Sequence, residues 1–376
     1  MSEAGADKIG LSKAGLRLLS RLRVAQSPEE LFKDGLSARL LSQMLEGGLL
    51  EPQRHTVGPT DYQEAYVNWS SQRGMLLDHT RTRAFRRAIE TLVKAGDRVV
   101  DVGTGSGILA MFAARAGAVE SVGLEFTEMA AWAERLAKAN GLSAIRIVRG
   151  DAAEYCAERP VDLVMGEFAG MWLIDEWRHY AAFCAVRDRN LRAGGTVLPR
   201  AARLYLSAID SRKLYLVRGY GFWEAPVQGF DFSGVRCAEI AHPRRWIITA
   251  DPNNIVDTKE IAAFDFLWGS ERDCCFTAEA RFTYPAAGKF HGVVGHFEMD
   301  MAPGQVLSTG PSEHDTHWHQ SYFPMPAMDV PAGGSVTVRV RTFIDEDSGI
   351  MQVALAVAGE GEALAADTRE HIYVIE

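Results

Sequence analysis

Two glutamates, Glu167 and Glu176, stand nine positions apart in the segment GEFAGMWLIDEW, among aromatic residues and glycine. Two carboxylates in a partly apolar cleft raise each other's pKa unless a cation lies between them. A guanidinium group suits that position, because it stays protonated at neutral pH and its planar fork of donors matches carboxylates. The pair therefore predicts a clamp for a guanidinium group.

A glycine-rich turn precedes this segment in the chain. Gly103, Gly105 and Gly107 follow the apolar run RVVDV and open a helical stretch. Glycine lets the backbone approach a ligand closely, and the spacing Gly-x-Gly-x-Gly favours S-adenosylmethionine over NAD. Glu125, at the end of the next apolar run, is placed to accept hydrogen bonds from both ribose hydroxyls. A glycine turn used only for packing is the alternative.

Three more acids are predicted to belong to this cofactor site. Asp101 stands at the start of the glycine turn. Asp151 and Glu154 follow the third apolar run, where one of them could accept the adenine amino group. Each of these two could also be a solvated loop charge.

Short apolar runs that alternate with helical stretches predict a parallel, doubly wound sheet. The runs are 98–103, 121–125, 146–150 and 161–166, with helices at 107–116 and 127–140 between the first three. The glutamate segment begins where the fourth run ends, at the carboxyl edge of the sheet, where ligands of this architecture bind. We therefore expect Glu167 to face the methyl group of the cofactor.

The chain divides into three predicted parts. Residues 1–58 read as three short helices, a winged-helix-like module for which packing or dimer contact is favoured over binding DNA or a peptide. Residues 59–199 form the predicted nucleotide-binding domain. Residues 200–376 alternate like the strands of an antiparallel barrel or sandwich, in which residues 213–245 could project as an arm.

Composition narrows the class of protein. The 376 residues are 47% hydrophobic and 24% charged, which is typical of a globular protein of about two domains. A net charge of −9 argues against nucleic acid as the main partner and fits a cationic substrate, although solubility alone explains many acidic enzymes.

Five cysteines without Cys-x-x-Cys spacing predict neither a metal site nor disulfides. We expect a cytoplasmic protein without a signal peptide or membrane span.

From about Tyr62 to its C-terminus, the sequence resembles the protein arginine methyltransferase family. The family's paired-glutamate hairpin is similar to the segment from Glu167 to Glu176, and its Thr-His-Trp loop is present as residues 316–318. Its N-terminal Tyr-x-x-x-Tyr, Met-Leu and Arg-Thr motifs resemble Tyr62, Tyr66, Met75-Leu76 and Arg81-Thr82.

This resemblance implies a Rossmann-like methyltransferase domain followed by an antiparallel β-barrel. It implies S-adenosylmethionine as cofactor and arginine as substrate. It also implies a homodimer formed through the arm at 213–245, with Tyr220-Gly-Phe-Trp223 as apolar anchors.

The resemblance also implies roles for single residues. Glu167 and Glu176 would clamp the substrate guanidinium, and Arg81 would pair with the carboxylate of the cofactor. Asp78 would pair with His317, and ordering the N-terminal helix over the cofactor is favoured over relaying a proton. Met75 and Tyr66 are assigned to the cofactor site, and the predicted substrate-channel residues are Tyr62, Tyr66 and Trp318.

The sequence departs from the family at several of these positions. Gln72 replaces a histidine before Met-Leu, Phe168-Ala169 replaces Trp-Met, and Trp177-Arg178 replaces Ser-Met. Arg178 could meet a free α-carboxylate, which a peptide substrate does not offer, or it could pair with Asp175. The substrate is therefore free L-arginine, another small guanidino compound, or arginine in a protein. An inactive scaffold and a methyltransferase for other small amines or hydroxyls are the competing classes.

Overall fold

A computed structural model of the chain describes residues 69–170, 172–236, 252–360, 364 and 369–375. The chain divides into two units, residues 1–56 and 57–376, and all described residues belong to the second. The predicted N-terminal module, Tyr62 and Tyr66 lie outside the described residues. None of the described helices is both long and apolar enough to cross a membrane.

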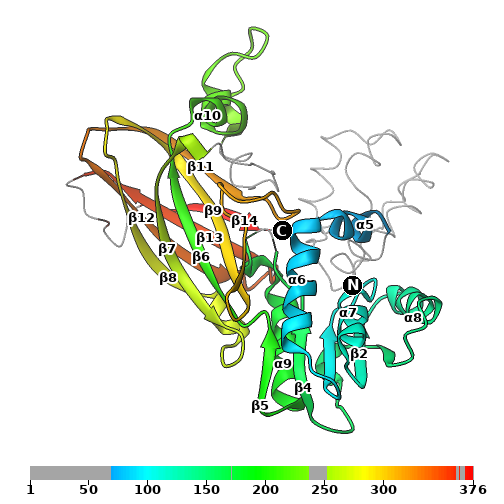
Figure 1. Cartoon of the computed structure of the whole chain (residues 1–376). Coiled ribbons are helices and arrows are strands. Elements are labelled where there is room, and N and C mark those ends of the chain that lie inside the picture. Colours follow the sequence, from blue (N-terminus) through cyan, green and yellow to red (C-terminus); the bar gives the residue numbers. More distant parts are fainter. Residues whose placement is uncertain (1–68, 171, 237–251, 361–363, 365–368, 376) are drawn as a thin grey trace, which may run out of the picture. The chain divides into compact units, whose positions relative to one another are not determined.

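A parallel sheet forms the first half of the described chain (Figure 1). Its strand order is β3-β2-β1-β4-β5, which confirms the predicted doubly wound sheet. The strands are β1 (Arg98–Val102), β2 (Glu120–Glu125), β3 (Ile145–Arg149), β4 (Val161–Gly166) and β5 (Leu191–Leu198). The helices after β1, β2 and β4 are α7 (Ile108–Ala116), α8 (Met129–Ala139) and α9 (Trp177–Asn190).

Two helices, α5 (Trp69–Leu77) and α6 (His79–Leu92), lead into this sheet. Asp78 separates them as the N-cap of α6, because its side chain accepts a hydrogen bond from the backbone N–H of Arg81 at 2.8 Å. The apolar face of α6, which includes Phe85 and Ile89, is fully buried. The cap and this face together fix the direction in which Arg81 leaves the helix.

Two antiparallel sheets form the second half, as predicted for a β-barrel. The first contains β6 (Ala201–Ile209), β7 (Ile255–Asp265), β9 (Gly288–Ala302), β10 (Gln305–Ser308) and β11 (Ser321–Val330). The second contains β8 (Thr277–Thr283), β12 (Ser335–Ile344), β13 (Met351–Ala358) and β14 (His371–Ile375). Residues along β12 alternate between buried and partly exposed positions, so one face of that sheet packs inside the domain.

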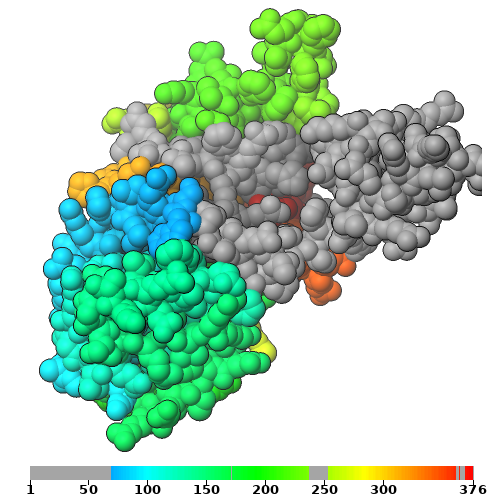
Figure 2. Space-filling model, turned by 90° about the vertical axis from the view of Figure 1, so that its right-hand side faces the viewer, coloured from blue at the N-terminus to red at the C-terminus, as the bar shows by residue number. Residues whose placement is uncertain are grey.

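The described part of the arm contains α10 (Arg212–Arg218) and the 3-10 turns η3 (Tyr220–Glu224) and η4 (Ser233–Val235). It stands out from the antiparallel sheets as the light green segment of Figures 1 and 2. Our prediction for its anchors needs a correction, because Tyr220 is buried and its hydroxyl lies 3.0 Å from His371 Nδ1. The exposed apolar side chains of the arm are Leu216, Val217, Phe222, Phe230, Phe232 and Val235.

Candidate active site

A cavity of about 720 Å³ lies at the carboxyl edge of the parallel sheet. Its volume is within the range of ligand-binding pockets, roughly 300–1,000 Å³. The walls come from α5, the glycine turn, the glutamate segment, the start of α9 and the loop at 316–318. The predicted site residues that line it are Met75, Arg81, Gly103, Gly105, Glu125, Asp151, Glu167, Glu176, Arg178, His317 and Trp318.

The glycine turn and Glu125 form one hydrogen-bonded unit. Gly105 has φ 54°, and its N–H donates to Glu125 Oε2 at 2.9 Å. The other oxygen of Glu125 accepts hydrogen bonds from the N–H and the hydroxyl of Thr127. The carboxylate is therefore buried and fixed at the end of β2, where the ribose hydroxyls were expected.

Gln72 closes this turn from the side of α5. Its Oε1 accepts the N–H of Ser106 at 3.1 Å, and its side chain is buried. A methyl group added to Gly105 would lie 3.0 Å from that oxygen. The residue that departs from the family therefore tethers α5 to the glycine turn, a role that no local sequence pattern indicates.

Two predicted cofactor ligands need correction, because neither lines the cavity. Asp101 is fully buried and accepts hydrogen bonds from the Thr104 hydroxyl and the Ala110 N–H. Burial raises the pKa of Asp101 to about 7. Gly107 has φ 83°, and a methyl group there would lie 3.3 Å from Ala133 of α8. Both residues therefore shape the turn from positions behind the cavity wall.

The two candidate adenine-binding acids differ in whether they line the cavity. Asp151 lines the cavity, and its Oδ1 accepts the N–H of Ala153 at 2.9 Å. Glu154 is exposed and lies outside the cavity wall. Asp151 is therefore the better placed of the two.

A tight turn brings Glu167 and Glu176 to the same cavity. Gly170 and Leu173 form a bridge, with φ 66° at Leu173. Asp175 lies beneath the turn and accepts the N–H of Trp172 at 3.2 Å. A methyl group on Gly170 would lie 2.2 Å from the carboxylate of Asp175, so the turn requires glycine at this position.

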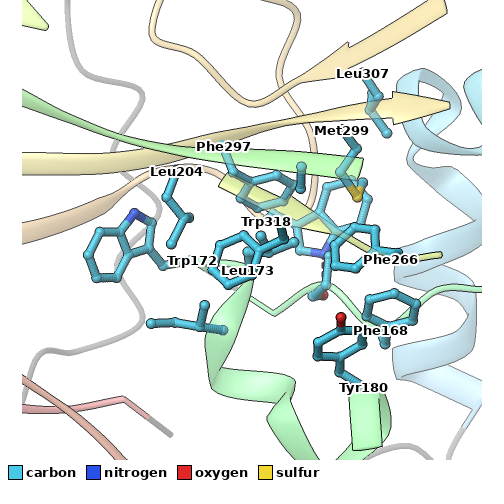
Figure 3. Close-up of a cluster of buried hydrophobic side chains, with 14 of the residues drawn as sticks. Phe168, Trp172, Leu173, Tyr180, Leu204, Phe266, Phe297, Met299, Leu307 and Trp318 are labelled. Atoms are coloured by element: carbon cyan, nitrogen blue, oxygen red, sulfur yellow. Dashed lines mark hydrogen bonds between the residues drawn. The ribbon is translucent and has the colours of Figure 1, made fainter. Parts of the chain in front are cut away.

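Aromatic side chains of both domains hold this turn in place (Figure 3). Trp172 is fully buried, and a methyl group on Gly295 of β9 would lie 2.5 Å from its indole nitrogen. Trp318 donates its indole N–H to the Ala169 carbonyl at 2.7 Å. Because Trp318 is 1% exposed, it supports the turn and reaches the cavity wall only with part of its ring. Residues of the antiparallel half of the described chain therefore help to position Glu167 and Glu176.

Glu167 already contacts a cation of its own chain. Its Oε2 accepts hydrogen bonds from Arg81 Nε at 3.0 Å and Nη2 at 2.7 Å, and its Oε1 accepts the Ala169 N–H at 3.0 Å. Arg81 was expected to pair with the cofactor's carboxylate, whereas the structure places it on the first clamp residue. A carboxylate has about four lone-pair positions, so Oε1 retains one for a further donor.

Glu176 also has a basic neighbour, which the sequence analysis missed. The side chain of Glu176 is 6% exposed, and His179 Nδ1 lies 3.3 Å from its Oε2. The side chain of His179 is 43% exposed, and against the opposing effect of burial, Glu176 beside it, with the charges of Glu167 and Glu125, raises the pKa of His179 above the ordinary value. The spacing of three residues at a helix start was the available signal.

The predicted contact between Asp78 and His317 is present. Asp78 Oδ2 lies 2.8 Å from His317 Nδ1 and accepts the His317 backbone N–H at 2.8 Å. Burial raises the pKa of Asp78, but the hydrogen bonds from His317 and from the Arg81 N–H outweigh burial and lower it. A single ionised carboxylate therefore joins the start of α6 to the loop of the antiparallel domain.

Arg178 lies half-buried at the cavity wall. Its Nη2 donates to the Gly349 carbonyl at 2.9 Å, and its guanidinium carbon lies 5.0 Å from the centre of the Trp177 ring. Among the described residues, no acidic side chain forms an ion pair with Arg178. The alternative in which Asp175 neutralises it is therefore not what the structure shows.

Comparison with known proteins gives two matching family models. One, described as the arginine methyltransferase oligomerization subdomain, matches residues 200–348. The other, described as ribosomal protein L11 methyltransferase (PrmA), matches residues 78–169. The two models therefore match the two halves of the described chain.

Curated relatives match a longer stretch of the chain than either family model. Protein arginine N-methyltransferase 1.1 of Arabidopsis thaliana is 33% identical over 270 residues, covering 69% of this chain and 67% of that protein. Protein arginine N-methyltransferase 1 of Dictyostelium discoideum is 32% identical over 268 residues, covering 69% of this chain and 77% of that protein.

Solved structures agree with these relatives. The Trypanosoma brucei PRMT1 enzyme-prozyme heterotetrameric complex with AdoHcy contains a chain that matches with a TM-score of 0.75 and 27% identity, over 83% of this chain and 100% of that one. Arabidopsis thaliana protein arginine methyltransferase 10 matches with a TM-score of 0.71 and 25% identity, over 84% of this chain and 100% of that one. The chain belongs to the protein arginine N-methyltransferase family.

Proposed function

We propose that the protein transfers a methyl group from S-adenosylmethionine to a terminal guanidino nitrogen of arginine. The observation that carries this proposal is the pair of buried carboxylates, Glu167 and Glu176, in the same cavity as the glycine turn. The cavity fits the cofactor, because Gly103 of the glycine turn has open space where a side chain would lie and Glu125 is fixed at the end of β2. When bound, S-adenosylmethionine supplies an electrophilic methyl group.

The two carboxylates would act mainly by positioning and by electrostatics. They hold the plane of the substrate guanidinium and draw its positive charge toward the nitrogens that do not react. The remaining nitrogen would then keep lone-pair density for attack on the methyl carbon. The N–C bond would form as the S–CH₃ bond breaks, with the thioether as leaving group, and the proton of the methylated nitrogen would pass to water afterwards. Arg81, on Glu167 Oε2, fixes this carboxylate so that Oε1, which also accepts the Ala169 N–H, keeps one position for a substrate donor.

For the substrate we propose free L-arginine, with Arg178 as the residue that binds its α-carboxylate. Arg178 lies in the wall of the same cavity as Glu176, and within the described chain it uses one guanidinium donor, on Gly349. A guanidinium fork binds a carboxylate through two parallel hydrogen bonds. Arginine within a peptide has no free α-carboxylate to offer.

Agmatine, which is arginine without its carboxylate, provides the test. We expect the wild-type enzyme to show a KM for agmatine about 10- to 100-fold above that for L-arginine, because a charge-assisted contact is worth about 1.5–3 kcal/mol. Arg178→Met should remove most of this difference by raising the KM for L-arginine alone. Steady-state assays with labelled methyl donor measure both values.

The matched control is Arg86→Met, which removes an exposed guanidinium of α6 paired with Glu90. It should leave the preference for L-arginine unchanged. An enzyme that labels an arginine- and glycine-rich peptide but not L-arginine would refute the free-arginine assignment. It would favour the second candidate substrate, protein-bound arginine, which is what the names of the relatives state for those proteins.

We also propose that the chain forms a homodimer through its arm. The arm carries exposed apolar side chains such as Phe230, which is 70% exposed, and it lies within the segment that matches the oligomerization subdomain. Analytical ultracentrifugation at micromolar concentration should give twice the chain mass, and Phe230→Ser should shift the equilibrium toward single chains. A wild-type mass of one chain at every concentration would contradict the proposal.

A further inference from the structure

Each of the two clamp residues has a basic neighbour, Arg81 beside Glu167 and the 43% exposed His179 beside Glu176. Arg81 contacts Glu167 Oε2 at 2.7 Å, and His179 contacts Glu176 Oε2 at 3.3 Å. All four side chains line the one cavity. A substrate guanidinium therefore enters a site in which each carboxylate already has a basic partner from the chain itself.

The two partners differ in what they can do when the substrate arrives. Arginine stays charged at any pH the protein meets, whereas histidine can lose its proton near neutral pH. A protonated His179 competes with the substrate cation for Glu176 and repels it, because like charges in a partly buried site interact strongly. A neutral His179 no longer offsets the charge of Glu176 that attracts the substrate.

We propose that His179 is a positioning residue that holds Glu176 while the site is empty and releases it, by losing a proton, when the substrate guanidinium binds. The proposal rests on the proposed function, since it requires the guanidinium to reach Glu176. It makes His179 a determinant of substrate affinity, in addition to the two glutamates themselves. It balances charge, because one cation binds while one proton leaves.

The direction of the pH effect follows from the groups around the imidazole. The charged and titratable groups that line the cavity with His179 are Arg81, Glu125, Asp151, Glu167, Asp175, Glu176, Arg178 and His317. Burial lowers the pKa of His179, but Glu176 beside it and the charges of Glu167 and Glu125 raise the pKa above its ordinary value of about 6.5. Below that pKa His179 is charged and holds Glu176, and substrate affinity should rise as pH increases through it.

Calorimetry of the full-length protein with S-adenosylhomocysteine present measures this linkage. L-Arginine and an arginine- and glycine-rich peptide are titrated between pH 6 and 8.5, in buffers of different ionisation enthalpy. For the ligand that binds, we expect proton release near neutral pH and a Kd about fourfold or more lower at pH 8.5 than at pH 6, from one-proton linkage. KM should show the same pH dependence, with little change in kcat.

Three variants separate a titrating role from a merely structural one. His179→Gln keeps a polar group beside Glu176 but cannot change charge, so it should bind substrate without proton release or pH dependence. His179→Lys keeps a permanent charge and should weaken substrate binding at every pH. His314→Gln, at an exposed position outside the cavity wall, is the matched control and should behave as wild type.

The outcomes distinguish this proposal from the function on which it rests. Turnover together with wild-type proton release in His179→Gln would overturn the role of His179 alone. Turnover with no proton release in the wild type would do the same. Absence of binding and turnover with both ligands would overturn the proposed function and this proposal with it.

Discussion

Glu167→Gln is expected to lower kcat by about 10²- to 10³-fold, the usual loss when one preorganised electrostatic group of an active site is removed. The amide has one acceptor oxygen, while Glu167 uses Oε2 for Arg81 and Oε1 for the Ala169 N–H. An amide NH₂ placed at either oxygen would face a donor. The variant therefore cannot keep Arg81, the turn and the substrate guanidinium bound together.

Affinity for the cofactor should change far less than turnover, because the glycine turn and Glu125 make no hydrogen bond to Glu167. Single-turnover kinetics and calorimetry with S-adenosylhomocysteine measure the two quantities separately. Glu154→Gln, which changes an exposed carboxylate outside the cavity wall, is the matched control and should keep wild-type kcat. Unchanged turnover in Glu167→Gln would refute the proposal that Glu167 clamps the substrate guanidinium.

The sequence allows the parallel sheet to be predicted closely, because its strands are short apolar runs bounded by glycine and by helices. β4 begins and ends as predicted, and the bounds predicted for β1, β2 and β3 differ by one residue at each end at most, whereas β5 was not predicted. The alternation of strands and helices along the sequence is enough to predict that the site lies at the carboxyl edge of the sheet. Division into the parts 1–58, 59–199 and 200–376 remains a prediction.

The chemistry of single side chains is less accessible from sequence. Asp101 stands beside the glycine turn and resembles a ligand residue, but the inward direction of its side chain becomes known only from the fold. The pair of Arg81 and Glu167 joins residues 86 positions apart, and it depends on the packing of α6 against α7 and against β9 and β10. His179 was missed because α9 carries no strong amphipathic pattern that would mark its first turn.

Family resemblance predicted the contact between Asp78 and His317 but not its consequence. The contact spans 239 positions in the sequence, and no local pattern indicates it. In the structure, the same carboxylate caps α6, so helix start and interdomain contact depend on one residue. A change at this position should therefore affect stability and cofactor binding together, which distinguishes an ordering role from a proton relay.

Asp78→Asn is expected to lower the free energy of unfolding by about 2–3 kcal/mol, the cost of leaving buried donors without an acceptor. In one amide orientation the NH₂ faces the two His317 donors, and in the other it faces the Arg81 N–H that the cap requires. Urea unfolding at pH 7 measures the loss. Asp97→Asn, which caps a solvent-facing turn through the Lys94 N–H, is the control and should lose less.

The pH dependence of this loss has a fixed sign. Hydrogen bonds lower the pKa of folded Asp78, so its contribution to stability is present above the unfolded pKa of about 3.9 and is lost as pH falls through the folded value. The difference in the free energy of unfolding between wild type and Asp78→Asn should therefore become smaller in acid.

An ordering role also predicts that S-adenosylhomocysteine binds Asp78→Asn about tenfold or more weakly, because α5 and its Gln72 tether to the glycine turn lose their fixed position. A variant with lowered kcat but wild-type affinity for S-adenosylhomocysteine would instead make the pair a proton relay.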